Sequence, residues 1–95
     1  MVIGTLVLRL QVPDSESLKE KRQVVRSLAA RVRRTFNVAV AEVGDQDLWQ
    51  AVELGVACVS TDARHADEIC QKVLNFVENY GEAQLTRSRF EVLRV

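Results

Sequence analysis

The sequence predicts one α+β domain whose elements follow the order strand, helix, strand, strand, helix, strand. Two patterns lead to this prediction, because apolar residues alternate with polar ones in several stretches and recur about every 3.6 residues in two others. Length is the third observation, since 95 residues form one compact domain and do not suffice for two. We therefore treat residues 1–95 as a single domain. A content of 47% hydrophobic and 27% charged residues is typical of a folded chain.

The first two elements are a strand and a helix. Alternation over residues 2–12 predicts a strand with one buried face, and Pro13 ends it because proline has no N–H for a sheet. Ser17 and Glu20 form a capping box that begins a helix running from about Leu18 to Thr35. The apolar stripe of this helix predicts a face packed on a core, and it consists of Leu18, Val24, Val25, Leu28, Ala29 and Val32.

The remaining elements are a hairpin, a second helix and a last strand. Residues 37–43 and 48–60 predict two strands joined by a turn at residues 44–47, with Gly55 expected to mark a bulge. Thr61 and Asp62 are expected to cap the second helix, and Gly81 to end it as a left-handed residue. Residues 83–95 give the last strand.

This order, closed with short connections and right-handed crossovers, predicts a ferredoxin-like split βαβ fold. Its four-stranded antiparallel sheet would have the order 4-1-3-2, with both helices on one face. The other face starts uncovered, and we expect a second copy of the chain to cover it in a homodimer. Trp49 would anchor this interface, and Arg9 and Glu53 would pair across it or lie at its rim. A monomer with a solvated sheet is the alternative. The residues expected on this face are Val7, Arg9, Ala39, Ala41, Trp49, Ala51 and Ala57.

Charge is distributed unevenly along the chain. The first helix holds seven basic residues and one acid, hence a charge of +6, and the rest of this chain of zero net charge carries −6. Lys19, Arg22, Arg26 and Arg33 fall within about 60° of one another on a helical wheel, which forms a row suited to a phosphate backbone. A solvated helix face is the alternative, because Lys and Arg are good helix formers.

Lys21 differs from these four cations because it projects from the apolar side of the first turn. It is either a stem that reaches past the core to water or an ammonium that faces a ligand. With Lys21 included, the candidate RNA-binding residues are Lys19, Lys21, Arg22, Arg26 and Arg33.

The residues contain no recognisable catalytic or metal-binding set. His65 stands alone, and we find no histidine next to Ser15, Ser17 or Ser60, so no nucleophile and base pair is expected. Zinc would need more ligands than His65 and the two cysteines supply, and the carboxylates near the hairpin follow no calcium-loop pattern; these are Glu42, Asp45, Asp47 and Glu53.

The cysteines, the apolar runs and the aromatic residues limit where the protein can reside and how it can bind RNA. Cys58 and Cys70 are expected to be reduced core residues, because they stand in apolar surroundings without C-x-x-C spacing. Since no apolar run reaches the ~20 residues that cross a bilayer, we expect a cytoplasmic protein. Trp49 is the only aromatic residue of the expected first and third strands, and no GXXG clamp is present, which disfavours base recognition of the RRM or KH kind.

The segment Ser17–Leu28, SLKEKRQVVRSL, resembles the YlxP-like family, a bacterial domain of unknown function. The resemblance continues through FNVAVAEV at 36–43, DQDLWQ at 45–50 and LGVA at 54–57, and so covers essentially the whole chain. It implies a ferredoxin-like fold and a gene neighbourhood of translation initiation and ribosome-assembly factors. It implies no established activity and no catalytic residues. Thr35 departs from the pattern, since the family often has a basic residue there, and this shortens the basic row at its end.

The main functional hypothesis is a non-catalytic auxiliary protein that binds RNA or a ribosomal particle through the basic helix face, without cofactor or metal. The alternative is a structural or interaction protein that homodimerises through the open sheet face and has no nucleic-acid role. The two can coexist. An enzyme or small-ligand sensor is a third class, for which the sequence shows no site.

Overall fold

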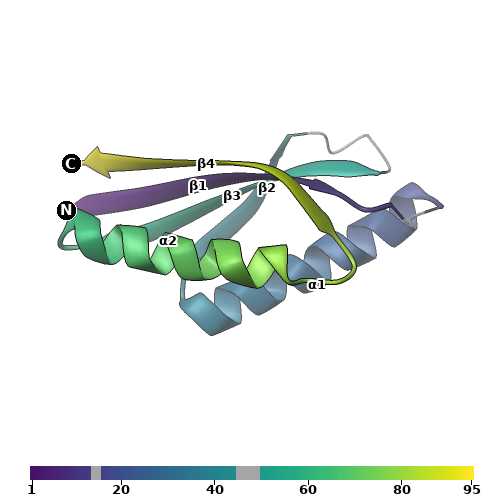
Figure 1. The fold of residues 1–95 in the computed structure, drawn as a ribbon, viewed down its shortest axis with the longest axis horizontal. Helices are drawn as coiled ribbons and strands as arrows, with labels where there is room; N and C mark the ends of the chain where they lie inside the picture. The colour runs from purple at the N-terminus through teal and green to yellow at the C-terminus, as the bar shows by residue number, and fades with distance from the viewer. Residues whose placement is uncertain (14–15, 45–49) are drawn as a thin grey trace.

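The computed structural model describes residues 1–13, 16–44 and 50–95 and contains the expected six elements. They are β1 (Val2–Gln11), α1 (Leu18–Phe36), β2 (Ala39–Gly44), β3 (Ala51–Ser60), α2 (Ala63–Glu78) and β4 (Gln84–Arg94). The four strands form one antiparallel sheet in the order β2-β3-β1-β4, which is the expected 4-1-3-2 read from the other edge. Both helices lie on one face of this sheet (Figure 1). The ferredoxin-like prediction is therefore confirmed. The expected turn residues 45–47 lie outside the described residues.

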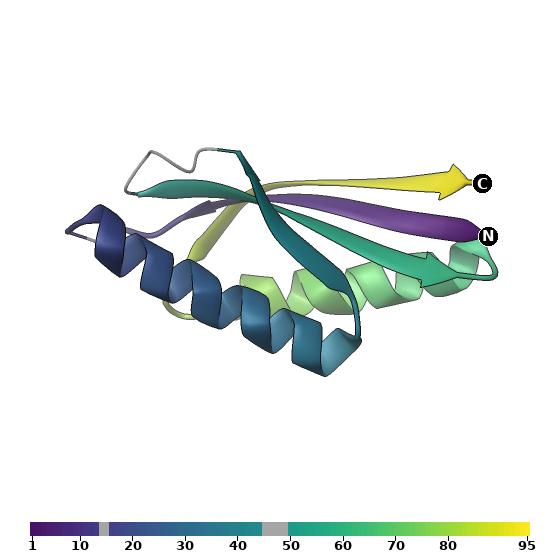
Figure 2. The same ribbon diagram turned by 180° about the vertical axis from the view of Figure 1, so that it is seen from behind.

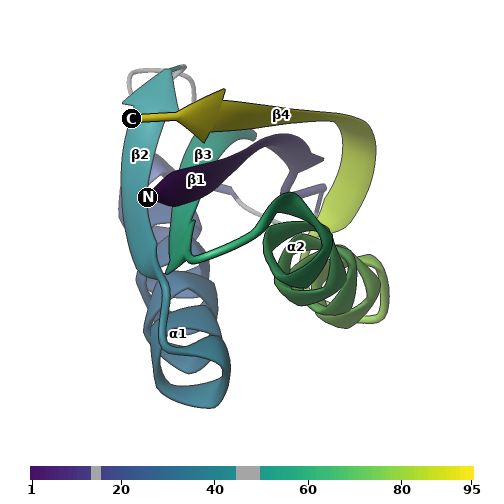
Figure 3. The same ribbon diagram turned by 90° about the vertical axis from the view of Figure 1, so that its left-hand side faces the viewer.

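The core lies between the sheet and the two helices. Strand β1 alternates strictly between buried and half-buried residues, as period two requires. Its buried residues Leu6, Leu8 and Leu10 face the helices and meet Val25 and Leu28 of α1 within the core cluster. Seen end-on, α1 lies below the β2 side of the sheet and α2 below the β1 and β4 side (Figure 3). None of the described residues forms a helix on the opposite face of the sheet (Figure 3).

Helix α1 begins and ends with the groups that its sequence provides. Ser17 Oγ accepts the N–H of Glu20 at 3.2 Å, as the capping box predicts. The Glu20 carboxylate accepts the N–H of Glu16 at 2.7 Å, one residue earlier than the usual reciprocal bond. Asn37 ends the helix in the left-handed region with φ 53°, and its N–H donates to the Arg33 carbonyl at 3.0 Å.

Helix α2 begins as expected and ends differently. The Asp62 carboxylate accepts the N–H of His65 at 2.8 Å and is the N-cap. The prediction that Gly81 ends the helix in a left-handed conformation was wrong, because none of the described glycines has positive φ. The helix instead ends at Glu78, and the next turn tightens so that the Tyr80 N–H donates to the Val77 carbonyl at 3.1 Å.

Gly55 does not mark a bulge, which corrects a second expectation. It pairs regularly with Val7 on one side and with Ala41 on the other. The register shift lies in β2, where Val43 is the extra residue between the pairs of Glu42 and Gly44. A Cβ built at Gly55 would lie 2.9 Å from the Val43 Cγ1 atom, so glycine lets this exposed side chain approach without a shift.

The two cysteines lie in the core, as expected. Cys58 of β3 and Cys70 of α2 are both buried and form no disulfide. Burial raises the pKa of the Cys58 thiol. Burial, together with Cys58 and Asp67, raises the pKa of Cys70 to about 11. Within the described parts of the chain, neither helix has the length and apolarity to span a membrane.

Candidate nucleic-acid interface

Four exposed cations follow one flank of α1 and form the candidate interface. These are the side chains of Lys19, Arg22, Arg26 and Arg33, and we call them the basic row. Helix α1 lies beside the edge strand β2 (Figure 2). Arg26 and Arg33 line a hollow of about 120 Å³ together with Ala41 and Glu42 of β2. The structure therefore places the expected row on one accessible surface.

Arg33 is positioned by a bond to the sheet. One of its terminal nitrogens donates to the Val40 carbonyl of β2 at 2.8 Å. The other N–H groups of a guanidinium point in fixed directions away from such a bond, so a positioned arginine can still donate to an anion. Arg33 also lies in the last turn of α1, where a cation stabilises the negative end of the helix dipole. Its presence is thus explained in part by the fold itself.

Lys21 does not belong to this interface, which corrects its assignment as an RNA-binding residue. Its side chain is fully buried, and its Nζ donates to the Ala51 carbonyl at 3.2 Å. A phosphate in solvent cannot reach an ammonium in this position. Lys21 projects from the apolar side of the first turn, and its side chain therefore crosses the core to β3. Lys21 therefore ties α1 to the first residue of β3.

Arg31 faces the other helix instead of the basic row. Its guanidinium lies over the ring of Tyr80 at 5.8 Å from the centroid. The Tyr80 hydroxyl also lies 3.4 Å from the Ser27 hydroxyl of α1. These contacts join α1 to the turn that follows α2. The cations of α1 thus include an exposed row, a buried lysine and an arginine that packs on Tyr80.

The open sheet face carries most of the residues expected at a dimer interface. Val7, Arg9, Ala39 and Ala41 lie on it by strand register. Ala51 lies on this face by register as well but is only 6% exposed, so it offers almost no surface to a partner. Trp49, the expected anchor, lies outside the described residues.

Aliphatic side chains that the sequence reasoning did not single out as exposed also lie on this face. Val43 and Val59 are 59% and 66% exposed, and Leu93 is exposed as well. The small side chains of Ala39, Ala41 and Ala57 leave a shallow hollow of about 290 Å³ between Val7 and Val43, with an almost wholly apolar lining. The open face is thus uneven, and its centre is apolar.

Three arginines meet at the β1 and β4 side of the open face, and the sequence reasoning missed two of them. Arg9 pairs directly with Arg87 of β4 and, on its other side, with Glu53 of β3. Arg87 and Arg89 line a hollow of about 330 Å³ with Arg9, Glu53, Ser88 and Val7. Alternation alone shows that Arg87 and Arg89 share a face of their strand. That they lie beside Arg9 can be seen only once the pairing register of β1 and β4 is known.

Ser60 and His65 lie together, contrary to the expectation that Ser60 has no histidine nearby. The Ser60 hydroxyl lies 2.9 Å from Nδ1 of His65, because the last residue of β3 and the first turn of α2 meet at this end of the sheet. Ser60 Oγ also accepts the N–H of Asp62 at 3.2 Å, so this hydroxyl contacts both the backbone and the side chain of the first residues of the helix.

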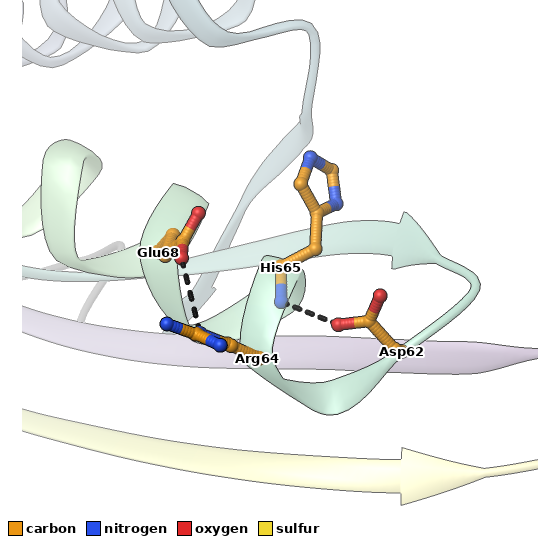
Figure 4. A network of polar contacts seen from close by, with 4 residues as sticks. All are labelled: Asp62, Arg64, His65 and Glu68. Carbon is orange, nitrogen blue, oxygen red and sulfur yellow. Dashed lines mark hydrogen bonds and ion pairs between the residues drawn. The ribbon is translucent and has the colours of Figure 1, made fainter.

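This pair does not form the usual catalytic triad. The Asp62 carboxylate binds the backbone N–H of His65, and the imidazole ring points away from it and from the Arg64 and Glu68 ion pair (Figure 4). A triad needs the acid on the ring, where it orients the base. Ser60 is moreover buried. The arrangement caps the start of α2.

Acidic side chains do not gather into a metal site in the part of the chain that the structure describes, where no three His, Cys, Asp or Glu residues could share an ion. Glu42 and Glu53 lie on opposite faces of the sheet by register, since Glu42 pairs with inward-facing Leu54. Asp45 and Asp47 fall outside the described residues.

Comparison with known proteins identifies the family. The family described as "Protein of unknown function (DUF503)" matches residues 3–90. The chain belongs to this family. It is also 37% identical over 90 residues to the uncharacterized protein YlxP of Bacillus subtilis strain 168, an alignment that covers 95% of this chain and 98% of YlxP. The expected YlxP-like membership is therefore confirmed.

Solved structures with similar folds are distant in sequence from this DUF503 member. A mutant of SnoaB, a cofactor-independent oxygenase from Streptomyces nogalater, has 16% identity and a TM-score of 0.48, with 98% of this chain and 92% of that chain covered. A de novo designed protein with ferredoxin fold has 14% identity and a TM-score of 0.48, with 96% and 86% covered. At this identity such a likeness concerns the fold and not the activity.

Proposed function

We propose that this protein is a non-catalytic, cytoplasmic RNA-binding protein that associates with RNA or a ribosomal particle through the basic row of α1. The observation that carries the proposal is the exposure of Lys19, Arg22, Arg26 and Arg33 on one flank of the helix. A duplex RNA backbone presents regularly spaced phosphates, and a straight row of cations on a rigid helix matches such an array.

The charge distribution supports the same function. The chain has no net charge, so attraction to RNA must come from one side of the molecule rather than from the whole. Helix α1 supplies the positive side, and the surplus of acidic residues lies elsewhere in the chain. Phosphate contacts of this kind bind without reading sequence, which agrees with an auxiliary role on a large RNA particle.

Salt dependence tests the proposal. If four cations each neutralise a phosphate, the logarithm of affinity for ribosomal RNA should fall against log salt with a slope of roughly −3 to −4. Reversing two of them, in the variant Arg22→Glu/Arg26→Glu, should flatten the slope to about −2 or to a value closer to zero. The matched control is Arg64→Glu/Lys72→Glu on α2, which changes net charge equally and should keep the slope.

A second readout is sedimentation of native ribosomal particles. The wild type should travel with a subunit or its precursor, and the α1 double variant should remain at the top of the gradient. Equal RNA affinity in both double variants, or no RNA binding by the wild type at low salt, would leave the basic row as a solvated helix face.

A second candidate function is homodimerisation through the open sheet face, with no nucleic-acid role. The exposed Val43, Val59 and Leu93 favour it, because exposed aliphatic side chains on one sheet face are often covered by a partner. A two-fold axis would place the same patch against itself.

The mass in solution decides this second candidate. A dimer is expected in sedimentation at micromolar concentration, with a shift toward monomer in Val59→Glu and in Trp49→Glu while the fold is retained. Val95→Glu is the control, because it adds the same charge at another exposed valine. A wild-type monomer at high concentration would contradict dimerisation.

A further inference from the structure

Three hollows follow one another from the helix flank across the open sheet face, and adjacent hollows share a residue. The first lies between α1 and β2 and is lined by Arg26, Arg33 and Ala41. The second is the apolar hollow, which runs from Ala41 to Val7. The third begins at Val7 and contains the arginines of β1 and β4. Because adjacent hollows share a lining residue, we treat the three as one series that passes around the β2 edge and over the sheet, and we call this series the track.

The track has positive charge at both ends and an apolar centre. Arg26 and Arg33 lie at its α1 end together with Glu42, and Arg9, Arg87 and Arg89 lie at its β4 end together with Glu53, so the lining arginines outnumber the lining acids at each end. The lining of the centre contains aliphatic residues, glycine and one threonine. A single-stranded nucleic acid has matching chemistry, because its phosphates pair with cations and the faces of its unpaired bases are apolar enough to pack on aliphatic side chains in place of aromatic ones.

The geometry at the β4 end favours an anion there. Arg9 and Arg87 occupy directly opposed positions on neighbouring strands, where like charges repel. The strand register shifts at this point, and Thr86 donates its hydroxyl proton to the Arg9 carbonyl at 3.2 Å. Glu91 lies 3.2 Å from Nε of Arg89 and Glu53 lies opposite Arg9 on β3, so the two nearby acids do not remove the surplus of positive charge. A bound phosphate would relieve the repulsion.

The dimensions fit a chain-like ligand. From β2 to β4 the sheet is three strand spacings wide, or roughly 14 Å. Each of the two open-face hollows lies near the lower limit of cavities that enclose small ligands, roughly 300 to 1,000 Å³. A compact ligand would fill one hollow only, whereas an extended strand can use all three.

We propose that the track binds single-stranded RNA, with phosphates at the arginines of its two ends and a base over the apolar hollow. The inference rests on the proposed function only for the α1 end. It goes beyond that function by adding the open face and by naming unpaired RNA as the ligand. It also excludes a homodimer that covers the same face.

The test measures binding of the whole chain to a labelled oligouridylate of about eight nucleotides, a length within the range of single-strand-binding domains. The variant Arg87→Gln/Arg89→Gln should bind more weakly, and its salt slope should be shallower by about 1.4, because single strands lose about 0.7 per phosphate contact. Arg64→Gln/Lys72→Gln on α2 should match the wild type. A carboxylate in the centre, Ala41→Glu, should weaken binding, whereas Ala41→Gln should not.

The outcomes separate this inference from the proposed function. If Arg22→Glu/Arg26→Glu weakens binding to duplex RNA while Arg87→Gln/Arg89→Gln binds the oligouridylate as the wild type does, the helix function stands and the track is refuted. If Arg87→Gln/Arg89→Gln weakens RNA binding and Arg22→Glu/Arg26→Glu does not, RNA binds on the open sheet face and the proposed function of the helix is refuted. A wild-type dimer that Ala41→Glu dissociates without loss of RNA affinity would also overturn the track. Unchanged circular dichroism and melting temperature confirm that each variant is folded.

Discussion

Lys21 shows how one residue can look like a ligand contact in sequence and serve the core in structure. The stem of lysine is apolar over four carbons, so it packs with the valines and leucines of α1. Its ammonium then needs an acceptor inside the protein, and the Ala51 carbonyl is one. The residue therefore connects the first turn of the helix with the start of β3.

The variant Lys21→Met should lower the free energy of unfolding by about 1–3 kcal/mol, because the thioether fills the space but leaves the buried Ala51 carbonyl without this donor. Urea denaturation measures the change. Lys19→Met, at an exposed position two residues earlier, should change stability by less than about 0.5 kcal/mol. RNA affinity should fall in Lys19→Met and stay constant in Lys21→Met. The reverse result would show that Lys21 contacts RNA.

The cysteines make a prediction about pH. A thiol whose pKa is higher in the folded than in the unfolded chain stabilises the fold fully below the unfolded pKa, and this contribution is lost as pH rises through the folded value. For Cys70, that window runs from the ordinary value of 9.0 to about 11. Stability should therefore fall across this range, and less steeply in Cys70→Ala.

A thiol reagent provides an independent measurement. Both Cys58 and Cys70 should react slowly at neutral pH in the native state and rapidly in denaturant, because burial and a raised pKa both limit the thiolate. Rapid native labelling of Cys58 would show that β3 presents the opposite face to the helices.

At the level of elements, the contact of α2 with the central strand depends on a missing side chain. Gly4 of β1 pairs with Cys58 and faces α2. A Cβ built at Gly4 would lie 3.0 Å from the Ala66 Cβ and 3.3 Å from the Cys70 Sγ. The neighbours here belong to a helix packed on a sheet, so the space cannot open by rotation of a flexible side chain. At Gly55 the neighbour is the exposed end of Val43, which can move.

Gly4→Ala should therefore lower the free energy of unfolding by about 1–3 kcal/mol through overpacking. Gly55→Ala is the matched control and should cost less than about 1 kcal/mol. Adding Ala66→Gly to Gly4→Ala should recover part of the loss, although glycine inside a helix costs about 1 kcal/mol alone. A thermodynamic cycle of these variants measures the coupling. Strict additivity would contradict the contact.

At the level of the whole molecule, the sequence predicted what depends on local periodicity and missed what depends on register. Alternation placed the first strand at residues 2–12, against the observed Val2–Gln11, and helical spacing placed α1 within one residue of its observed end. Short connections and right-handed crossovers then limited the possible topologies to a few.

The missed features all join residues that are distant in sequence or depend on a neighbouring element. The Arg9 and Arg87 pair, the bond from Lys21 to Ala51 and the space above Gly55 are determined by strand pairing and helix docking. Ser60 and His65 are close in sequence, but the turn between strand and helix decides whether their side chains meet. No single-sequence pattern encodes these contacts.

The bond between Arg33 and the Val40 carbonyl also bears on aggregation. Strand β2 is an edge of the sheet, and an edge with unpaired backbone groups is a template for a strand from another molecule. The Arg33 guanidinium occupies one of those groups and places a cation across the strand. Removing it would expose a short apolar edge to intermolecular pairing. A loss of RNA binding in Arg33→Glu would then reflect fibril-like association as readily as a lost phosphate contact, which makes Arg22 and Arg26 the informative positions for charge reversal.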